Sequence, residues 1–335
     1  MKRKQIGMNQ LKDSLEREIT YLRLSVTDRC QFRCVYCMPP EGVTLLPQSE
    51  YLSPEEMERF IRAVAEMGVS RLRLTGGEPL LRKDIVSLVA RFSAIPGIRD
   101  LALTTNGARL PELVSDLKQA GLQRINISLD SLNAQRFREI TRSDSFHKVR
   151  EGIFSALEAG LKVKINVVAM KGISEEEIDG FAELASRHPL EVRFLEFMPL
   201  CGTGWKPDLV LPIESIRSRI ADNYDLRPIF RGSEVAESYD MVGGRGRVGF
   251  IASMTEPFCS TCSRIRMGAT GRIRLCLFSK LEYNLLPTLR RGASLEEIQE
   301  EIRRAVQRKP ASHPWILPEA GRRPEENGII RSIGG

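Results

Sequence analysis

The sequence contains few histidines and no long apolar run. Three histidines occur in 335 residues, and no stretch approaches the roughly 18 apolar residues that a membrane-crossing helix needs. The first segment, MKRKQIGMNQLKDSLERE, is charged and lacks the apolar stretch of a secretory leader. We therefore expect no membrane association and a cytoplasmic location, where thiols stay reduced.

Aromatic residues are also scarce. They make up 6% of the chain, and no basic patch is interleaved with them, as stacking on nucleic-acid bases requires. The formal net charge of +7 suits an anionic ligand, or simply a solvated basic surface. We expect no nucleic-acid partner, and a zinc-stabilised nucleic-acid-binding protein is the alternative from a different functional class.

Cysteine is present but unevenly distributed. Six of the seven cysteines fall into two groups of three. The first cysteine group is Cys30, Cys34 and Cys37, and the second cysteine group is Cys259, Cys262 and Cys276. A secreted disulfide scaffold usually has an even count in a short chain, so this distribution favours metal ligation by thiolates.

Short apolar runs alternate with helical patterns over about the first two hundred residues. The runs typical of strands cover residues 21–26, 71–75, 100–105, 124–129, 162–169 and 191–197. Strands that alternate with helices form right-handed βαβ units and a parallel sheet. Because eight such units close a full TIM barrel, six units predict an α/β fold with an incomplete (β/α)6 TIM-like barrel.

Two of the predicted helices carry clear start signals. At the first, Ser53 is the expected N-cap, Glu56 completes a capping box, and Gly68 ends the helix. Ser174 begins the same pattern in SEEEIDGFAELA, so we expect a second capped helix there.

The regular alternation stops near residue 201. Gly-rich, irregular segments such as CGTGWKP and MVGGRGRVGF follow. We place a boundary near Trp205, which predicts a barrel unit over residues 1–205 and a smaller C-terminal region over residues 206–335.

The first cysteine group lies in CQFRCVYC, directly after a predicted strand. Its spacing also suits three buried residues on one helical face, but Pro39 and Pro40 would end such a helix at once. Loops at the carboxyl ends of strands build the active sites of barrel folds. Three thiolates leave one iron of a four-iron cluster open, whereas a zinc site would need a distant histidine.

The CxxxCxxC spacing, with Tyr36 before its last cysteine, resembles the signature of the radical S-adenosylmethionine (SAM) superfamily. The resemblance implies that the amino and carboxylate groups of SAM bind the open iron. The segment GGEP, residues 76–79, follows the next strand and resembles the superfamily segment that holds the amino group. Its glycines let the backbone approach a ligand, and we expect the Glu78 carboxylate to be able to meet an ammonium group.

The second cysteine group again offers three ligands with no histidine between them. It predicts either a second cluster with one open iron or a structural zinc site that borrows a ligand such as Cys201. The cluster is favoured because the first site already implies cluster loading. Arg264 and Arg266 lie between the last two cysteines, on a predicted strand, where both would face a bound anion.

Basic residues interrupt the predicted buried strands. Arg23, Arg73, Lys164 and Arg193 occur where strands covered by helices should be almost wholly apolar. One such residue could reach solvent from a strand end, but an unpaired buried charge costs several kcal/mol. Together with the two arginines of the second cysteine region, they predict a polyanion such as a triphosphate, because arginine forks match phosphate oxygens.

Blocks from about Tyr21 to Gly335 resemble, in order, one family of that superfamily. They are YLRLSVTDRCQFRCVYCMP, RLTGGEPLLR, LTTNG, INISLDSL, RFLEFM, FCSTCSRIR, LCLF and the terminal IGG. The family is the GTP 3′,8-cyclase that opens molybdenum cofactor biosynthesis. The resemblance implies a lyase that converts GTP to 3′,8-cyclo-7,8-dihydro-GTP through a 5′-deoxyadenosyl radical that takes the C3′ hydrogen.

The resemblance also implies roles for individual residues. The two cysteine groups would hold two [4Fe-4S] clusters. The residues implied to contact SAM are Tyr36, Gly77, Ser128 and Met198. Those implied to bind GTP are Arg23, Arg73, Thr104, Lys164, Arg193, Arg264, Ile265 and Arg266. The implied catalytic positions are the first cysteine group, Arg264, Arg266, Gly334 and Gly335.

The same resemblance implies partners. An external electron donor of the flavodoxin or ferredoxin type would reduce the first cluster, a cyclic pyranopterin monophosphate synthase would take the product, and the chain would form a homodimer. The alternative within enzymes is another radical SAM enzyme with an auxiliary cluster, such as one that modifies a peptide. That alternative explains the second cysteine group but not the basic strands.

The Gly-Gly end of the chain gives a first prediction. The resemblance implies that this tail enters the active site, so removing Gly334 and Gly335 should abolish turnover of GTP. The rate of product formation by the truncated protein measures this. An unchanged rate would reject the role.

Overall fold

The computed structural model describes residues 10–200, 204–232 and 234–313 of the chain. The predictions for Cys201, Gly334 and Gly335 lie outside these described residues. Within them, no helix is both long enough and apolar enough to cross a membrane.

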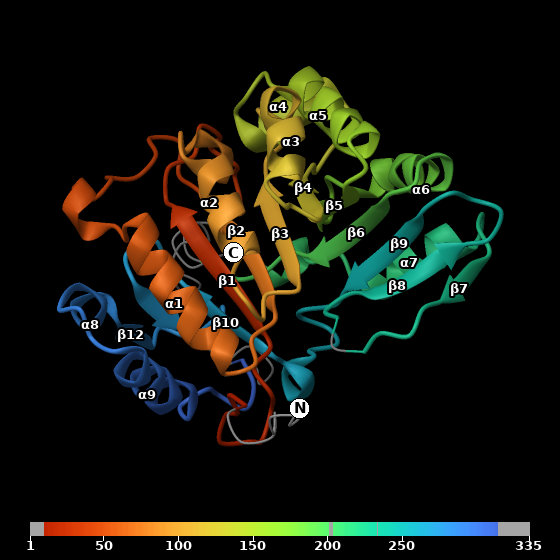
Figure 1. The fold of residues 1–335 in the computed structure, drawn as a ribbon. Helices are drawn as coiled ribbons and strands as arrows, with labels where there is room; N and C mark the ends of the chain where they lie inside the picture. The colour runs from red at the N-terminus through yellow and green to blue at the C-terminus, as the bar shows by residue number, and fades with distance from the viewer. Residues whose placement is uncertain (1–9, 201–203, 233, 314–335) are drawn as a thin grey trace, which may run out of the picture.

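One curved sheet runs through the described structure (Figure 1). Its central strands are β1 (Tyr21–Thr27), β2 (Arg71–Gly76), β3 (Asp100–Thr105), β4 (Arg124–Ser128), β5 (Lys162–Ala169) and β6 (Glu191–Glu196). Each strand pairs in parallel with the next one along the chain. All six predicted strands are present, with ends that differ by at most one residue, so the incomplete six-unit barrel is confirmed.

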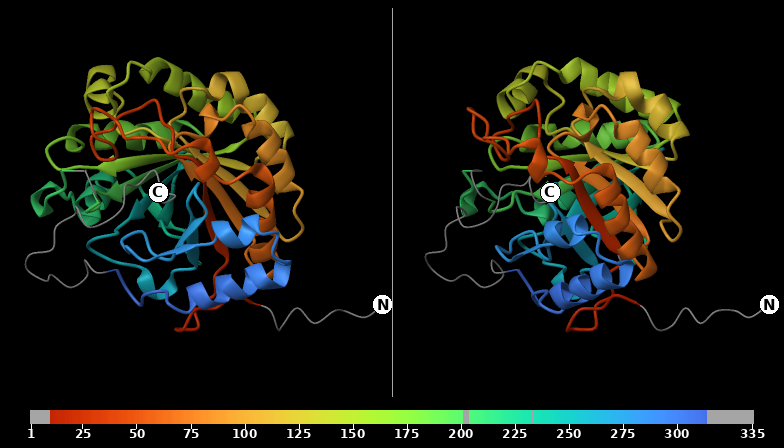
Figure 2. Two further views of the ribbon diagram at one scale, coloured as in Figure 1. Left: turned by 90° about the vertical axis from the view of Figure 1, so that its left-hand side faces the viewer. Right: turned by 60° about the vertical axis from the view of Figure 1, so that its left-hand side comes forward.

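Helices connect these strands and lie on the outside of the curved sheet (Figure 2). They are α1 (Pro54–Glu66), α2 (Ile85–Ser93), α3 (Leu110–Gln119), α4 (Ala134–Thr141), α5 (Phe146–Glu158) and α6 (Ile178–Arg187). Leu22, Leu24, Leu72 and Leu74 are buried in the core between strands and helices. Because side chains alternate along a strand, the residues between them face the inner side of the sheet.

The C-terminal region extends this sheet at both edges. Strand β9 (Arg247–Ile251) pairs in parallel with β6, and β10 (Arg264–Met267) pairs in parallel with β1. Beyond β9 the sheet continues with the antiparallel strands β8 (Glu237–Met241) and β7 (Leu226–Pro228), and beyond β10 with the antiparallel strands β11 (Arg272–Arg274) and β12 (Glu282–Asn284). The sheet therefore has 12 strands. The boundary near Trp205 stays a prediction, and the hydrogen-bonded sheet continues across it.

Three further helices belong to this C-terminal region. They are α7 (Ile213–Ala221), α8 (Leu286–Arg290) and α9 (Leu295–Val306). Helix α9 begins with a capping box between Ser294 and Glu297, and it buries Ile298 and Ile302 in the common core. The two predicted units therefore share one hydrophobic core.

The two helix start signals had different outcomes. At α1 the Ser53 hydroxyl accepts from the Glu56 N–H at 3.2 Å, and the Glu56 carboxylate accepts from the Ser53 N–H at 2.7 Å. The prediction at Ser174 is confirmed in part: Ser174 is the N-cap of a 3-10 helix, Glu175–Glu177, that runs directly into α6, but its side chain makes no capping hydrogen bond. The Ser174 hydroxyl instead accepts from the Met170 N–H at 3.0 Å. A nearby backbone donor in the loop therefore competes with the helix for this side chain.

Candidate active site

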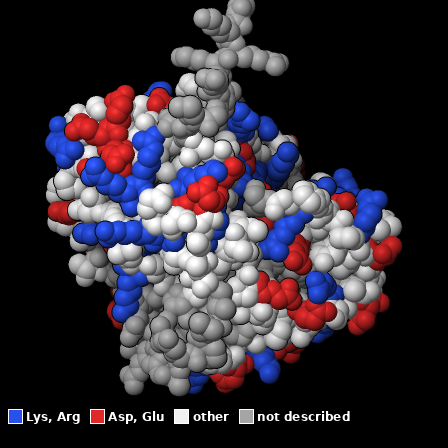
Figure 3. Space-filling model, turned by 90° about the horizontal axis from the view of Figure 1, so that it is seen from below, with Lys and Arg blue, Asp and Glu red and all other residues white. Residues whose placement is uncertain are grey.

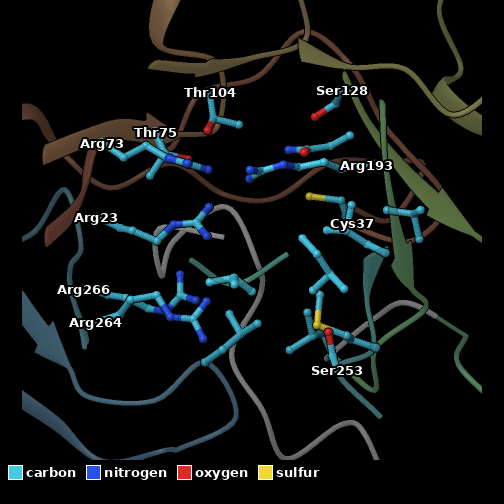
Figure 4. Close-up of a pocket in the computed structure, with 18 of the residues that line it drawn as sticks. Arg23, Cys37, Arg73, Thr75, Thr104, Ser128, Arg193, Ser253, Arg264 and Arg266 are labelled. Atoms are coloured by element: carbon cyan, nitrogen blue, oxygen red, sulfur yellow. The ribbon is translucent and has the colours of Figure 1, made fainter. Parts of the chain in front are cut away.

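All six cysteines of the two groups line one cavity on the inner side of the sheet, with a volume of about 300 Å³. Figure 4 shows labelled side chains converging on it from different strands. Most of the residues implied for SAM and GTP also line it. They are Tyr36, Gly77, Ser128, Met198, Arg23, Arg73, Thr104, Arg193, Arg264 and Arg266. The sheet therefore brings together residues from both ends of the chain.

Two residues implied for GTP do not line this cavity. The Ile265 side chain is fully buried in the hydrophobic core, because it alternates with Arg264 and Arg266 along β10. Lys164 is half-buried, and its ammonium contacts the Glu191 carboxylate at 2.9 Å. At Ile265 only the backbone is left for a ligand contact.

The first cysteine group lies on a loop that packs against α4. The Val35 N–H donates to the Ile140 carbonyl at 2.9 Å, and the Cys37 N–H donates to the Cys34 carbonyl at 2.9 Å. The Arg33 guanidinium also donates to the Cys30 carbonyl at 2.6 Å. The segment is thus a fixed turn, and not the helix that the spacing alone also allows.

The environment of these thiols fits a metal group. Burial raises the pKa of the Cys30 thiol to about 11, and burial together with the nearby Cys37 thiol raises the pKa of Cys34. Metal ligation needs the thiolate, and a bound cation favours exactly that ionised form. The Cys30 and Cys34 thiols therefore suit a cationic metal group, which would favour their ionised form.

Each cysteine group offers three thiols on the wall of the cavity. In a four-iron cluster each thiolate binds a different iron, so three thiolates leave one iron open to another ligand. The donor set of the first cysteine group therefore suits such a cluster, and the second cluster stays a prediction.

Gly76 and Gly77 bring the loop after β2 against the cysteine loop. The Gly77 N–H donates to the Thr27 carbonyl at 2.8 Å, and the Glu78 N–H donates to the Arg29 carbonyl at 2.7 Å. Gly76 has φ +139, and a Cβ on either glycine would collide with the backbone of the β1 loop. The glycines are needed for this approach between two loops, and both also line the cavity.

The Glu78 carboxylate accepts hydrogen bonds from the protein, and its expected contact with an ammonium group stays a prediction. It is 1% exposed and accepts from the Leu80 N–H at 2.9 Å, the Thr105 hydroxyl at 2.6 Å and the Asn106 N–H at 2.6 Å. Burial raises its pKa to about 7 despite these donors. Glu78 therefore ties the loops after β2 and β3 together beneath the cavity.

Asp130 is a site residue that sequence reasoning missed. The Tyr36 hydroxyl donates to one of its carboxylate oxygens at 2.6 Å, and the Val168 N–H donates to the other at 2.8 Å. Burial raises the pKa of Asp130 to about 6. The pair holds the Tyr36 ring beside the cysteines. A signal was available, because Asp130 follows Ser128 by two residues at the end of a strand.

The basic wall of the cavity consists of five arginines. They are Arg23, Arg73, Arg193, Arg264 and Arg266 (Figure 4). Arg73, Arg193 and Arg266 are only 7%, 4% and 4% exposed, so they do not reach solvent from strand ends. Burial and the like charge of Arg264 lower the pKa of Arg266 to about 9. An anion between these side chains would offset both burial and mutual repulsion.

Two carboxylates that sequence reasoning missed reduce this positive charge. Glu191 contacts Lys164 at 2.9 Å and Arg193 at 2.5 Å. Glu234 contacts Arg71 at 3.3 Å and Arg193 at 3.7 Å. Lys164 and Arg193 therefore already have anionic partners. Arg23, Arg264 and Arg266 lie together on the same cavity wall (Figure 4).

Replacing Glu191 by glutamine tests this charge balance. We expect Glu191→Gln to lower the free energy of unfolding by about 3 kcal/mol, because it removes the carboxylate that the half-buried Lys164 and the buried Arg193 share. Urea unfolding measures the change. As a control, Glu112→Gln removes an exposed pair with Arg109 and should cost less than about 1 kcal/mol. Equal losses in the two variants would contradict the prediction.

The second cysteine group has more positive surroundings than the first. Burial disfavours the Cys262 thiolate, yet Arg264 and Lys309 lower its pKa to about 6. Burial raises the pKa of Cys259. Arg264 and Lys309 thus provide positive charge that stabilises a thiolate in the second cysteine group.

The comparisons with known proteins agree with this site. Residues 24–185 match the radical SAM superfamily, so the fold and the cysteine loop define a radical SAM protein. Residues 190–315 match the family described as Molybdenum Cofactor Synthesis C. The chain is 47% identical over 305 residues to a GTP 3′,8-cyclase of Syntrophomonas wolfei. The matched region covers 90% of this chain and 94% of that protein. The chain belongs to the GTP 3′,8-cyclase family of radical SAM enzymes, as its sequence motifs predict.

Two further relatives place the chain more broadly. Molybdenum cofactor biosynthesis protein 1 of Drosophila melanogaster is 42% identical over 311 residues, covering 92% of this chain and 55% of that protein. Streptococcus suis SuiB bound to S-adenosylmethionine has a TM-score of 0.57 at 14% identity, covering 94% of this chain and 75% of that chain. The second likeness shows the fold alone. Membership of the superfamily implies one [4Fe-4S] cluster and SAM as cofactors.

Proposed function

We propose that this chain converts GTP to 3′,8-cyclo-7,8-dihydro-GTP, the first step of molybdenum cofactor biosynthesis. The observation that carries the proposal is a single cavity that joins both cysteine groups to five arginines. A peptide-modifying enzyme would use two cysteine groups but has no need of this basic wall. A triphosphate does need it, because arginine binds phosphate oxygens in pairs.

The first cysteine group would hold one [4Fe-4S] cluster with SAM on its open iron. When bound, these groups supply the 5′-deoxyadenosyl radical that takes the C3′ hydrogen of GTP. The backbone at Gly77 and the side chains of Ser128, Tyr36 and Met198 would hold SAM in place. This assignment is supported by their position on the cavity wall and by the Asp130 carboxylate that fixes Tyr36.

The second cysteine group would hold a second [4Fe-4S] cluster that faces the guanine ring. Arg23, Arg264 and Arg266 would bind the triphosphate, with Arg73, Arg193 and Thr104 nearby on the same wall. Phe258, Leu275 and Phe278 also line the cavity, and apolar side chains exclude water, which strengthens the electrostatic interactions inside the site. The main task of the protein is to hold guanine C8 over its own ribose.

Replacing Cys276 by serine should weaken GTP binding while the first cluster is retained. We expect the dissociation constant for GTP to rise by at least about tenfold, as when a ligand environment at a metal site is disturbed. Equilibrium dialysis of GTP and the iron content of the same preparation measure both parts. Unchanged GTP affinity would count against the second-cluster role.

The proposed reaction is tested by isotope transfer. The reconstituted protein is incubated without oxygen with SAM, a reductant and GTP deuterated at C3′, and the 5′-deoxyadenosine is analysed by mass spectrometry. Deuterium in 5′-deoxyadenosine supports GTP as the substrate. Formation of 5′-deoxyadenosine without deuterium, in an active preparation, overturns the GTP assignment and leaves the peptide-modifying alternative.

The metal content separates these enzymes from the nucleic-acid-binding alternative. Protein purified without oxygen should contain iron and acid-labile sulfide in equal amounts, because both clusters have that composition. Zinc in their place would overturn both enzyme interpretations.

The surface charge bears on the nucleic-acid-binding alternative as well. On the face in Figure 3, Lys and Arg are interspersed with Asp and Glu, as on an ordinary protein surface.

The partners are also part of the proposal. The reaction needs an electron from outside, for which we propose a flavodoxin- or ferredoxin-type donor in the cytoplasm. The net charge of +7 favours association with such acidic proteins. We further propose a homodimer, with a cyclic pyranopterin monophosphate synthase as the consumer of the product.

A further inference from the structure

Two buried cations from outside the second cysteine group hold its backbone in place. Arg17 precedes β1, and Lys309 follows helix α9. Neither residue lines the cavity, and neither was singled out by sequence motifs. Both donate hydrogen bonds to carbonyl groups in or beside the second cysteine group.

Arg17 joins three segments that are distant in the sequence. Its guanidinium donates to the Cys259 carbonyl at 2.8 Å, the Pro310 carbonyl at 2.7 Å and the Ala311 carbonyl at 3.0 Å. The Asp13 carboxylate accepts from its Nε at 2.6 Å and orients the group. The side chains of Arg17 and Asp13 are 8% and 0% exposed. The N-terminal segment, the Cys259 turn and the segment after α9 are therefore fixed to one another.

Lys309 fixes the other two cysteines of the group. Its Nζ donates to the Arg264 carbonyl at 2.8 Å and to the Leu275 carbonyl at 2.5 Å. Leu275 directly precedes Cys276, and Arg264 follows Cys262 by two residues. One ammonium group thus links the backbone beside Cys262 to the backbone beside Cys276.

Lys309 is also buried beside the second cysteine group. The residue is 5% exposed, and its ammonium lies between the backbone segments that carry Cys262 and Cys276.

We infer that Arg17 and Lys309 are positioning residues that hold the three thiols of the second cysteine group in their ligating arrangement. This inference rests on the proposed second cluster and adds that the ligands are arranged before the cluster binds. Partners that orient metal ligands in this way increase metal affinity, because the ligands lose less conformational entropy when the metal binds. The contacts to Pro310 and Ala311 attach the start of the C-terminal segment to the same arrangement.

The test compares thiol reactivity and metal content in Lys309→Met and Arg17→Lys. Reduced, metal-free protein is alkylated, and each cysteine is followed by mass spectrometry. We expect Cys259, whose carbonyl group Arg17 holds, to react about tenfold faster in Arg17→Lys, a factor taken from the lower end of the loss of metal affinity on removing a partner of a metal ligand. For Lys309→Met the deciding measurement is the iron content, because removing a cation beside Cys262 also disfavours its reactive thiolate. The first cysteine group, the internal reference, should react at its wild-type rate. After anaerobic reconstitution, iron content should fall towards that of one cluster.

Two matched control variants lose the same kind of contact elsewhere. Lys118 donates from Nζ to the Gly160 carbonyl at 3.0 Å, and Arg59 donates to the Leu289 carbonyl at 2.7 Å. Lys118→Met and Arg59→Lys should leave the alkylation rates of the second cysteine group and the iron content unchanged. An equal effect in these controls would show general loosening and overturn the inference.

The remaining outcomes are distinguishable. Wild-type alkylation rates and iron content in both test variants overturn the inference while the second cluster stands. If Lys309→Met does not fold, as judged by circular dichroism, Arg17→Lys decides alone. A wild-type protein with the iron of only one cluster would overturn both this inference and the second cluster of the proposed function. Both would also be overturned if replacing Cys259, Cys262 and Cys276 together by alanine left the iron content at the wild-type level.

Discussion

Replacing Cys34 by alanine is expected to reduce the formation of 5′-deoxyadenosine from SAM to the level seen without protein. Its thiol lies between those of Cys30 and Cys37 in the loop sequence, and three thiolates are needed to hold three irons of the first cluster. Without that cluster, SAM has no site that can reduce it. Anaerobic reconstitution followed by chromatography of 5′-deoxyadenosine measures the loss.

The control for this variant is Cys259→Ala in the second cysteine group. That variant should still cleave SAM slowly, because the first cysteine group is intact. The thermal unfolding midpoint of Cys34→Ala without metal should stay close to that of the parent, so that the loss is one of chemistry and not of folding. Substantial 5′-deoxyadenosine formation by Cys34→Ala would show that the first cysteine group is not the cluster site.

Replacing Gly77 by alanine should have the second largest effect. A Cβ at this position would lie 2.8 Å from the Asp28 carbonyl carbon and closer still to the Arg29 carbonyl. The loop after β2 would have to move away from the cysteine loop, which we expect to cost about 3 kcal/mol, at the upper end for overpacking. SAM binding should be lost as well, because Gly77 lines the cavity beside the cysteines.

Urea unfolding and SAM binding by equilibrium dialysis measure these two effects. Gly180→Ala is the matched control, since the nearest atom to its added Cβ is a Leu132 methyl carbon at 3.2 Å. The flexible Leu132 side chain can move away from a methyl group at position 180, whereas the backbone carbonyl groups beside Gly77 cannot. Parent-like stability and SAM binding in Gly77→Ala would refute the close approach of the two loops.

The strands were predictable because their signals are local. Apolar alternation located all six central strands to within one residue, and the capping box located the start of α1. The expected capping bond at Ser174 does not form, because the Met170 N–H in the preceding loop donates to its hydroxyl. Local patterns do not register a competitor that tertiary folding brings close.

The candidate site was predictable only in part. Cysteine spacing and the GGEP turn identified the first site, and interior arginines indicated an anion. Glu191, Glu234 and Asp130 were missed, although they neutralise or orient predicted site residues. Acidic residues are frequent on surfaces, so a single buried carboxylate has no signature in the sequence. Only its partners across neighbouring strands reveal it.

The sequence by itself determined the chemistry of this protein: two groups of three thiols, a glycine turn and basic residues on alternating strand positions. The tertiary structure decided that these parts share one cavity. The C-terminal strands β9 and β10 pair with β6 and β1, at opposite edges of the same sheet, and so bring the second cysteine group opposite the first. It also decided that Arg17 and Lys309 support the second group. Pairing between strand edges depends on backbone hydrogen bonds that every residue except proline can make, so residue identity alone does not encode it.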